Sequence, residues 1–439
     1  MQDQRTQVYA QRLSRLIQAE TISQTNQTET TKFYRFHDLL RETFPNLFSV
    51  CQFEDFNGSF LLFWKGQSSR DPILLMHHHD VVEATGNWRY PPFSGTIADG
   101  KLWGRGTLDT KGGLWAMLQA ADELVAEGYL PERDTYFCSA CTEECDSTGA
   151  DKISQELLHR GIRFSLVLDE GGMIMEEPMA GAKGTFAMVG LGEKGCADLK
   201  FIARSSGGHA STPGKNTPLV RLGKFMTAVE RSNLFKTALP ATVCRMLETI
   251  AATMKPPLCF VLGHTRLFAP ILKRVIPMVS NTAGAMLKTT LAFTMASGSE
   301  GANVLPQEAW VIGNMRFSHH QGGEASIQAV RKLAEKYGIE TVVLDPGFSS
   351  PVTDTNSPAY ELVSKAVAHT FPGVIAAPYL MNGASDSRFM SRVSDHCIRF
   401  APFLITEEQM ASIHGIDENV DLSALAPAVD FYKYILTEA

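Results

Sequence analysis

The sequence predicts an α/β protein with a layered main domain on a mostly parallel sheet and a smaller, inserted α+β domain. Three observations predict this fold. Short apolar runs suited to buried parallel strands alternate with a helical pattern in the first half of the chain. From about residue 193 the pattern changes to strand, glycine loop and helix, and from residue 348 the α/β pattern returns. The 439 residues also exceed what one hydrophobic core usually holds.

The composition is ordinary for a globular protein, with 44% hydrophobic and 20% charged residues. The net charge of −7 and the isoelectric point near 6.0 argue against nucleic acid or an anionic membrane as the main partner. The longest apolar stretch, at 258–279, is interrupted by prolines and by Arg266, Lys273 and Arg274, so we expect no membrane span.

The N-terminal segment predicts an amphipathic helix, because four apolar residues fall on one helical face: Tyr9, Leu13, Leu16 and Ile17. Polar residues interrupt the segment throughout, so it lacks the apolar core of a secretory signal peptide. Without an export signal, the eight cysteines are best interpreted as reduced thiols, and we expect a cytoplasmic protein.

Three apolar runs predict buried strands: PILLM (72–76), TYFCSAC (135–141) and FSLVLD (164–169). Between the first two, the apolar residues of 114–125 fall on one helical face, and Gly128 is a plausible stop. Acids or histidines follow the three runs directly, as HHHD, TEE and DEGG. Because ligands of such sheets bind beyond the carboxyl ends of the strands, a functional site is predicted there.

The middle of the chain predicts the inserted domain, and we divide the chain into 1–192, 193–347 and 348–439. Strands are expected at 289–298, 309–318 and 340–345, with a helix at 324–338. Residues 240–290 follow no pattern that assigns a structure. The last part returns to α/β patterning and ends in a helix at 425–439.

The histidines after the first strand are candidate metal ligands. In an extended strand end, His78 and Asp80 point to one face, and His77 and His79 to the other. A metal-binding imidazole usually donates its second N–H to a carboxylate, so His78 oriented by Asp80 is a sensible pair. The pattern alone equally allows His77 or His79 as the ligand, or a histidine-rich surface turn.

Further acids are candidates for the same site. Asp109 lies among glycines that can bend the backbone into a cleft, where one carboxylate can hold two metal ions. A helix N-cap aspartate would look similar. Glu143 and Glu144 could divide the roles of proton acceptor and metal ligand, or form a solvated acidic turn.

The stretch HHHDVVEATGNWRYPPFSGTIADGKLWGRGTLDTKGG (77–113) closely resembles the zinc-binding core of the di-zinc peptidases and amidohydrolases typified by carboxypeptidase S, aminoacylase and succinyl-diaminopimelate desuccinylase. The resemblance continues through TEE, LDEGG, EKG, GGHASTP, GANVLP, MRFSH, SDSRF and IHGIDENV, over nearly the whole chain. The stretches YPPFSGTIADGKLWGRGTLDTK and NGASDSRFMSRVSDHCIRFAPF most resemble the branch of carboxypeptidase S, a Gly-X carboxypeptidase, and the N-acyl-amino-acid hydrolases. The resemblance implies a zinc-peptidase-like catalytic domain with an inserted, ferredoxin-like lid or dimerisation domain.

The resemblance also implies two zinc ions per subunit, with cobalt or manganese as possible substitutes. His78 and Asp169 would bind one zinc ion, and Glu144 and His414 the other. Asp109 would bridge the two ions.

Three more roles follow from the same resemblance. Glu170 is the alternative to Asp169 as a ligand, because the family varies at this segment. Glu143 would be the general base, and Asp80 would orient the metal-binding imidazole of His78.

Outside the metal ligands, the resemblance implies a homodimer in which His209 reaches the substrate carbonyl, often in the partner's site. Asn303 resembles a substrate-positioning residue, and Gly383 lies in a segment that lines the pocket in relatives. Arg316 and Arg388 are candidates for a bidentate contact with a substrate carboxylate, or they form surface or interdomain ion pairs.

Two departures from the family pattern stand near the predicted site. Glu83 replaces the usual proline, and His77 replaces a small residue. Neither removes a predicted ligand. Near the mouth of the site, an extra acid and an extra imidazole could alter the substrate preference.

The sequence therefore predicts hydrolysis of a peptide or N-acyl amide bond in a small substrate with a free carboxylate. A dipeptidase or another N-deacylase of the same family is the main alternative, and a non-catalytic metal-stabilised binding protein is a weaker one. A structural zinc or redox site on Cys138, Cys141 and Cys145 is also less favoured, because Cys138 lies in an apolar strand and no second C-x2-C pair follows.

Overall fold

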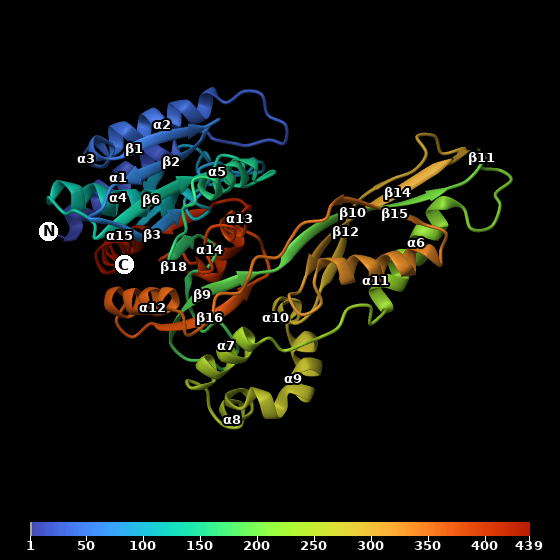
Figure 1. Cartoon of the computed structure of the whole chain (residues 1–439). Coiled ribbons are helices and arrows are strands. Elements are labelled where there is room, and N and C mark those ends of the chain that lie inside the picture. Colours follow the sequence, from blue (N-terminus) through green and yellow to red (C-terminus); the bar gives the residue numbers. More distant parts are fainter. Residues whose placement is uncertain (1) are drawn as a thin grey trace.

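The computed structural model describes residues 2–439, and its main part is built on a ten-stranded sheet (Figure 1). The strands of this sheet are β1 (Gln52–Phe56), β2 (Ser59–Trp64), β3 (Ser68–Met76), β6 (Arg133–Ser139), β7 (Leu166–Asp169), β8 (Ile174–Glu176), β9 (Thr185–Glu193), β16 (Ile375–Met381), β17 (Cys397–Arg399) and β18 (Leu404–Ile405). They lie in the order β1-β2-β6-β3-β7-β17-β9-β8-β18, with β16 beside β9. The central strands β6, β3, β7 and β17 are parallel. The three strands predicted in the first half are therefore neighbours whose carboxyl ends meet at one edge.

Helices cover both faces of this sheet. Successive residues of a strand point to opposite sides, so each strand contributes side chains to two cores. In β3, Ile73 and Leu75 belong to the larger core, whereas Leu74 and Met76 belong to the smaller one. The larger core is covered by α1 (Gln2–Ile17), α2 (Thr31–Thr43), α3 (Pro45–Val50), α4 (Lys111–Ala126), α12 (Pro358–Thr370) and α15 (Leu422–Glu438). The smaller core is covered by α5 (Thr148–His159) and α13 (Ser387–Met390).

Three short strands form a second, smaller sheet that holds two loops of the main part together. The strands β4 (Thr96–Ala98), β5 (Lys101–Trp103) and β19 (Asn419–Asp421) form a three-stranded sheet. Helix α14 (Glu407–Ser412) precedes β19. The pairing of β19 with β5 holds two loops, 104–110 and 413–418, close together.

An elongated arm extends from the main part (Figure 1). Its antiparallel sheet has the order β12-β14-β10-β15 and consists of β10 (Gly195–Arg204), β12 (Thr290–Ser297), β14 (Glu308–Phe317) and β15 (Glu340–Asp345). Helices α6 (Pro218–Arg231) and α11 (Gly323–Glu335) pack on this sheet through one apolar core. The short pair β11 (Gly208–His209) and β13 (Val304–Leu305) lies at the far end of the arm.

The segment without a recognisable pattern, 240–290, forms four helices: α7 (Ala241–Ala251), α8 (Leu258–Gly263), α9 (Thr265–Val279) and α10 (Asn281–Met286). Helix α7 packs against the main sheet, where Val243 and Leu247 meet Phe186, Ala377 and Leu380 in one core. This core continues into α8 and α9, which pack on α7. Prolines at the start of α8 and inside α9 hide the helical pattern in the sequence. Within residues 2–439, no helix combines the length and the apolar character of a membrane-spanning segment.

Candidate active site

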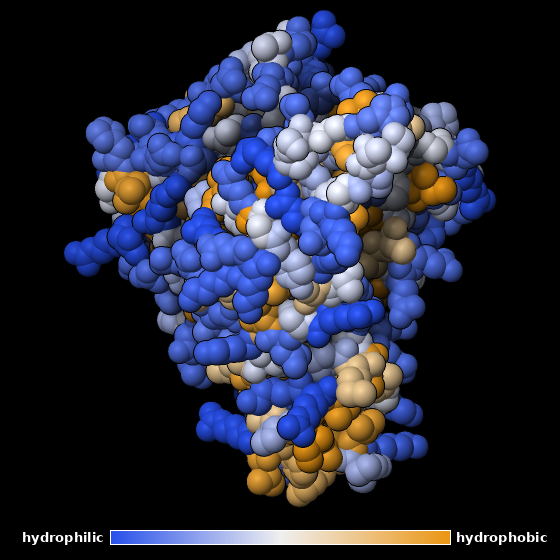
Figure 2. Space-filling view, turned by 90° about the vertical axis from the view of Figure 1, so that its right-hand side faces the viewer, coloured by the Kyte–Doolittle hydropathy of each residue, from blue (hydrophilic) through white to orange (hydrophobic). Residues whose placement is uncertain are grey.

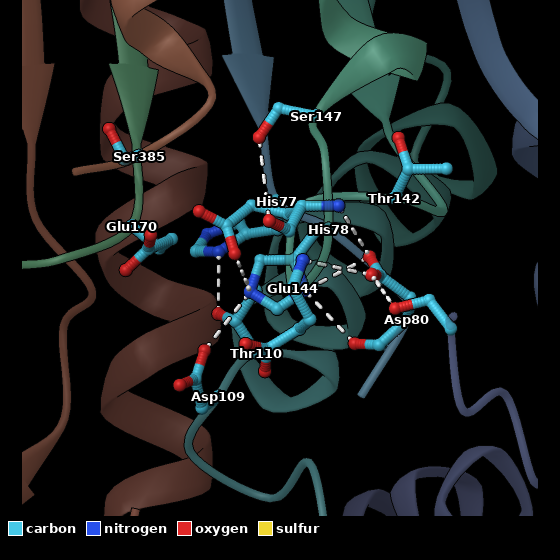
Figure 3. Close-up of polar contacts among 12 residues, drawn as sticks. His77, His78, Asp80, Asp109, Thr110, Thr142, Glu144, Ser147, Glu170 and Ser385 are labelled. Carbon is cyan, nitrogen blue, oxygen red and sulfur yellow. Dashed lines mark hydrogen bonds and ion pairs between the residues drawn. The ribbon is translucent and has the colours of Figure 1, made fainter. Parts of the chain in front are cut away.

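The carboxyl ends of β3, β6 and β7 bring the predicted site residues together (Figure 3). His78 is the second residue after β3, Glu143 and Glu144 follow β6, and Asp169 is the last residue of β7. Parallel neighbours end at the same edge of a sheet. Glu143 and Asp169, about 65 and 90 positions after His78 in the sequence, therefore lie near it. Asp109, from the loop before α4, and His414, from the loop after α14, complete the cluster.

Asp109 stands between the two imidazoles. Its Oδ1 lies 3.0 Å from Nε2 of His78, and its Oδ2 lies 3.1 Å from Nε2 of His414. Oε2 of Glu144 lies 3.0 Å from the same His414 nitrogen. The ligand atoms of His78, Asp109 and Glu144 all lie within 4.8 Å of one another. One carboxylate that offers its two oxygens to two separate imidazole groups is the arrangement that a metal-bridging carboxylate requires.

Of the three consecutive histidines, His78 faces the acids. His77 is buried, with Nδ1 3.0 Å from Oγ1 of Thr110 and Nε2 2.6 Å from the hydroxyl of Tyr432. Burial lowers the pKa of His77 to about 3, so its ring is neutral. His79 stacks in the core on a phenylalanine of α2. The expectation that the additional imidazole of His77 lies near the mouth of the site is therefore wrong, because its ring packs inward beneath the Asp109 loop.

The buried ring of His77 also explains a glycine of α4. A Cβ added at Gly113 would lie 2.2 Å from Cε1 of His77. We expect Gly113→Ala to lower the free energy of unfolding by about 1–3 kcal/mol through overpacking. Gly223→Ala in α6 is the matched control, since its Cβ would meet nothing within 4 Å. The control is expected to raise the free energy of unfolding by about 0.5–1 kcal/mol. Urea unfolding measures both, and equal effects would contradict the packing role.

Asp80 connects the histidine with the acidic turn. Nδ1 of His78 lies 3.0 Å from the Asp80 carbonyl oxygen and 3.4 Å from its carboxylate. The carboxylate accepts hydrogen bonds from the backbone N–H groups of Glu143 (3.2 Å) and Glu144 (3.0 Å). It also accepts one from Oγ of Ser23 at 2.7 Å. One buried aspartate thus fixes both the imidazole and the turn that carries the two glutamates.

Glu143 has the environment of a proton acceptor. Its Oε2 lies 4.0 Å from Nε2 of His78, and the residue lines the cavity described below. Burial raises the pKa of Glu143 well above its usual range. A carboxyl group whose pKa is raised toward neutrality can both accept and release a proton during catalysis.

The charges of the cluster favour a bound cation. Hydrogen bonds to Asp109 and Glu144 raise the pKa of His414 to about 10. Burial opposes the ionisation of Asp109, but hydrogen bonds from His414 and His78 pull the pKa of Asp109 below its usual range. Imidazoles and carboxylates are also the ligands that zinc takes in catalytic sites, so the residues present fit a divalent metal ion.

The structure separates the two candidate acids after β7. Both oxygens of Asp169 accept backbone N–H bonds, Oδ1 from Glu170 at 2.9 Å and Oδ2 from Ser387 at 2.8 Å. Across residues 2–439 no hydrogen bond reaches the Glu170 carboxylate, which has no dashed line in Figure 3. Burial and the nearby charges of Asp169, Asp109 and Glu143 raise the pKa of Glu170 well above its usual range. The Glu170 carboxylate is thus the one without a hydrogen-bond partner among the described residues, and the charges of Asp109 and Glu143 act on it.

A cavity of about 740 Å³ opens from the cluster toward the arm. Glu143, Glu144 and His414 line it together with three predicted substrate residues, Arg316, Gly383 and Arg388. The hydrogen-bond acceptors of the two arginine side chains are uncharged. Nη2 of Arg388 donates to Oγ of Ser147 at 2.9 Å, and Nε of Arg316 donates to Oδ1 of Asn314 at 3.1 Å. Neither arginine forms an ion pair with any described acid, so the alternative of a surface or interdomain ion pair is wrong.

His209 and Asn303 lie elsewhere. His209 is exposed in β11 at the far end of the arm, and its Nδ1 contacts Oγ of Ser211 at 2.7 Å (Figure 1). Asn303 is its neighbour there, since its carbonyl oxygen accepts the N–H of Ala210 at 2.9 Å. Within one chain, these two residues do not join the metal-ligand cluster.

Two residues that the sequence analysis did not single out hold the Asp109 loop. Oε1 of Glu418 accepts the backbone N–H groups of Leu108 (2.8 Å) and Asp109 (3.1 Å). Its Oε2 accepts the N–H of Gly106 (3.0 Å) and the guanidinium of Arg105 (2.8 Å). Both side chains of this ion pair are buried. The motif IHGIDENV contained Glu418, but only the fold shows what it contacts.

Asp386 is a third residue that was missed, although the motif SDSRF contains it. It is buried, and within the described chain neither of its carboxyl oxygens has a hydrogen-bond partner. Burial and the charge of Asp169 raise the pKa of Asp386 to about 8. An unpartnered buried carboxyl group is costly, and a cation in the neighbouring cluster would offset that cost.

The cysteines do not form the thiolate site considered as an alternative. Cys138 lies inside β6, and burial raises the pKa of its thiol well above the usual range. Burial also raises the pKa of Cys141 to about 12. All eight cysteines are free thiols. Protonated, buried thiols are poor metal ligands, so the metal-binding chemistry belongs to the histidines and acids.

A metal ion held by this cluster can activate water, and the buried glutamate beside it can take the proton. The fold and the site therefore define a metal-dependent hydrolase. The chain belongs to the peptidase family M20/M25/M40, whose family model matches residues 74–438. Membership confirms the resemblance seen in the sequence, and the enzyme is a metallopeptidase-type hydrolase of peptide or amide bonds.

Individual relatives agree with the predicted branch of the family. The chain is 30% identical over 446 residues to the probable carboxypeptidase S-like 2 of Dictyostelium discoideum, covering 97% of this chain and 84% of that one. It is 30% identical over 433 residues to the human N-fatty-acyl-amino acid synthase/hydrolase PM20D1, covering 96% and 86%. The metallo-carboxypeptidase Sso-CP2 from Sulfolobus solfataricus has a similar fold, with a TM-score of 0.70 at 15% identity and 97% of both chains covered.

Proposed function

We propose that the enzyme cleaves the amide bond of a short peptide or an N-acyl amino acid that carries a free carboxylate. The cavity that joins the metal-ligand cluster to Arg316 and Arg388 carries the proposal. A guanidinium group binds a carboxylate through two parallel N–H bonds, and neither arginine has an acidic partner of its own. The names of the carboxypeptidase S-like and N-fatty-acyl-amino acid relatives support this substrate class.

The same proposal includes two zinc ions per subunit, with cobalt or manganese as substitutes. His78 and an acid after β7 would hold one ion, Glu144 and His414 the other, and Asp109 both. For the acid after β7 we now favour Glu170 over Asp169, because both Asp169 oxygens already accept backbone N–H bonds. When bound, such ions supply Lewis-acid activation of water and of the scissile carbonyl.

The protein's own groups then move the proton. Glu143 accepts a proton from the attacking water and passes it to the leaving amine, since its buried carboxyl group favours the neutral form once protonated. Asp80 keeps the turn of Glu143 in place through two backbone N–H bonds. Arg316 and Arg388 fix the substrate at the other end of the cavity.

We further propose a homodimer in which His209 and Asn303 complete the site of the partner. Their position at the far end of the arm supports this, because it leaves them away from the cluster of their own chain (Figure 1). An imidazole N–H beside the substrate carbonyl would stabilise the negative charge that develops on its oxygen.

A mixing experiment tests this arrangement. His209→Ala and Glu143→Gln are each expected to lower activity by about 10²-fold or more. In an equal mixture after subunit exchange, half of the dimers combine one chain of each kind and contain one intact site. Activity should therefore recover to about a quarter of the wild-type value. No recovery, with mixed dimers verified by mass spectrometry, would contradict the shared site.

A substrate screen tests the proposed function. The metal-loaded enzyme is assayed with N-acyl amino acids, with dipeptides and with the C-terminal amides of both, and a chelator serves as the control. We expect hydrolysis of the free-carboxylate forms and a large loss with the amides. Equal rates for acids and amides would contradict the role of the arginines. Dipeptides cleaved far faster than N-acyl amino acids would favour the dipeptidase alternative.

We also propose the cytoplasm as the location of the enzyme. The eight free thiols support this, since thiols persist in a reducing compartment. Fractionation of cells that express the native gene tests the proposal.

A further inference from the structure

The segment that includes helices α7 to α10 differs in charge from the rest of the chain. Between 249 and 299 there is no aspartate or glutamate, although the whole chain has a net charge of −7. The same stretch contains five basic residues: Lys255, Arg266, Lys273, Arg274 and Lys288. The whole-chain charge argues against an anionic partner, but this part of the surface is cationic.

The same helices expose an apolar face. In α9, Leu267, Ile271, Val275 and Met278 are spaced four, four and three positions apart, so they form one stripe along the helix. Leu267 is 70% exposed and Met278 is 83% exposed. On α8, Leu258 and Phe260 are exposed as well. We call these six residues the apolar tip.

The apolar tip has a convex shape. Figure 2 shows a group of hydrophobic residues at the lower end of the molecule, with hydrophilic side chains projecting beside it. Figure 1 places α8 and α9 at that end, away from the arm and from the main sheet. A projecting end of this kind can touch a flat surface without interference from the rest of the molecule.

The charge decides which surface fits. Contiguous exposed apolar residues mark interaction sites. A second copy of the tip would bring Lys255, Arg266, Lys273 and Arg274 against the same four cations, which is unfavourable. Glu248, which accepts the hydroxyl of Thr265 at the start of α9, is a single acid against these four cations. Apolar residues flanked by lysine and arginine instead suit the boundary between acyl chains and anionic headgroups.

We propose that the α8–α9 tip docks this enzyme on an anionic lipid bilayer. The six apolar side chains enter the outer part of the bilayer, and Lys255, Arg266, Lys273 and Arg274 contact the headgroups. The other face of α9 stays packed on the protein, since Leu272 belongs to the core shared with β16. This inference does not depend on the proposed substrate or on the metal site.

Vesicle co-sedimentation of the full-length protein tests the proposal. The probes are phosphatidylcholine vesicles with and without one quarter phosphatidylserine. We expect sedimentation with the anionic vesicles only, and weaker sedimentation as salt is added, because salt screens the headgroup charge. No sedimentation with the anionic vesicles at low salt would overturn the proposal.

Two variants locate the binding surface. Leu267→Glu/Met278→Glu should abolish sedimentation, because it places two acids in the apolar stripe. The matched control is Leu130→Glu/Leu158→Glu, which makes the same charge change at two exposed leucines of the main part. The control should sediment like the wild type, and both variants should hydrolyse a small soluble substrate at the wild-type rate. Equal sedimentation of the two variants would contradict docking through the tip.

A third variant separates charge from apolar contact and guards against misfolding. Arg266→Gln/Arg274→Gln keeps the apolar stripe and should weaken binding by about fivefold for each cation removed. Size-exclusion chromatography without lipid is run in parallel. If Leu267→Glu/Met278→Glu instead converts a dimer into a monomer, the tip is a protein interface and the lipid proposal fails.

Discussion

Replacing the proposed base, Glu143→Gln, is expected to lower kcat by about 10²- to 10⁴-fold while metal content stays at the wild-type level. The substitution keeps the size of the side chain and removes its ability to accept a proton. The Glu143 side chain is 13% exposed beside the cluster, with its Oε2 4.0 Å from Nε2 of His78, so the metal ligands remain in place.

The measurement pairs steady-state kinetics with metal analysis by mass spectrometry. Glu132→Gln, at an exposed position of the main part, is the control and should be unchanged in both. Near-normal rates in a metal-replete assay would show that another group takes the proton. Loss of metal together with activity would show that Glu143 is a ligand.

The second large effect is expected at the buried ion pair of the Asp109 loop. Glu418→Gln should lower the free energy of unfolding by about 3–5 kcal/mol, because Arg105 keeps a buried charge without a carboxylate partner. The backbone N–H groups of Leu108 and Asp109 also lose a charged acceptor. Since the loop carries Asp109, metal affinity should fall as well.

Urea unfolding and zinc titration measure the two consequences. Glu408→Gln, at an exposed position of α14, is the matched control and should change stability by less than about 0.5 kcal/mol. A Glu418→Gln variant with wild-type stability and zinc affinity would contradict the role assigned to this ion pair.

The sequence predicted the part of the site that depends on local pattern and on sheet topology. Apolar runs indicate buried strands, and parallel neighbours end at one edge, so His78 and the two glutamates after β6 could be expected to meet. Pattern alone could not select His78 among three histidines. That choice depends on the turn after β3 and on the cores that hold His77 and His79.

Long-range contacts account for what was missed. Glu418 contacts a loop about 310 positions earlier in the chain, and no local pattern encodes this contact. The choice between Asp169 and Glu170 depends on which carboxylate the backbone of α13 binds. The helices of 240–290 contain prolines and take their stability from packing against the main sheet, so helical spacing alone did not show them.

The central claim is that Asp109 bridges two metal ions held by His78 and His414. Crystals grown with zinc and measured at the zinc absorption edge test it most directly. We predict two anomalous peaks per chain, about 3.5–4 Å apart, one on each side of the Asp109 carboxylate. A single peak, or peaks that do not touch Asp109, would contradict the claim.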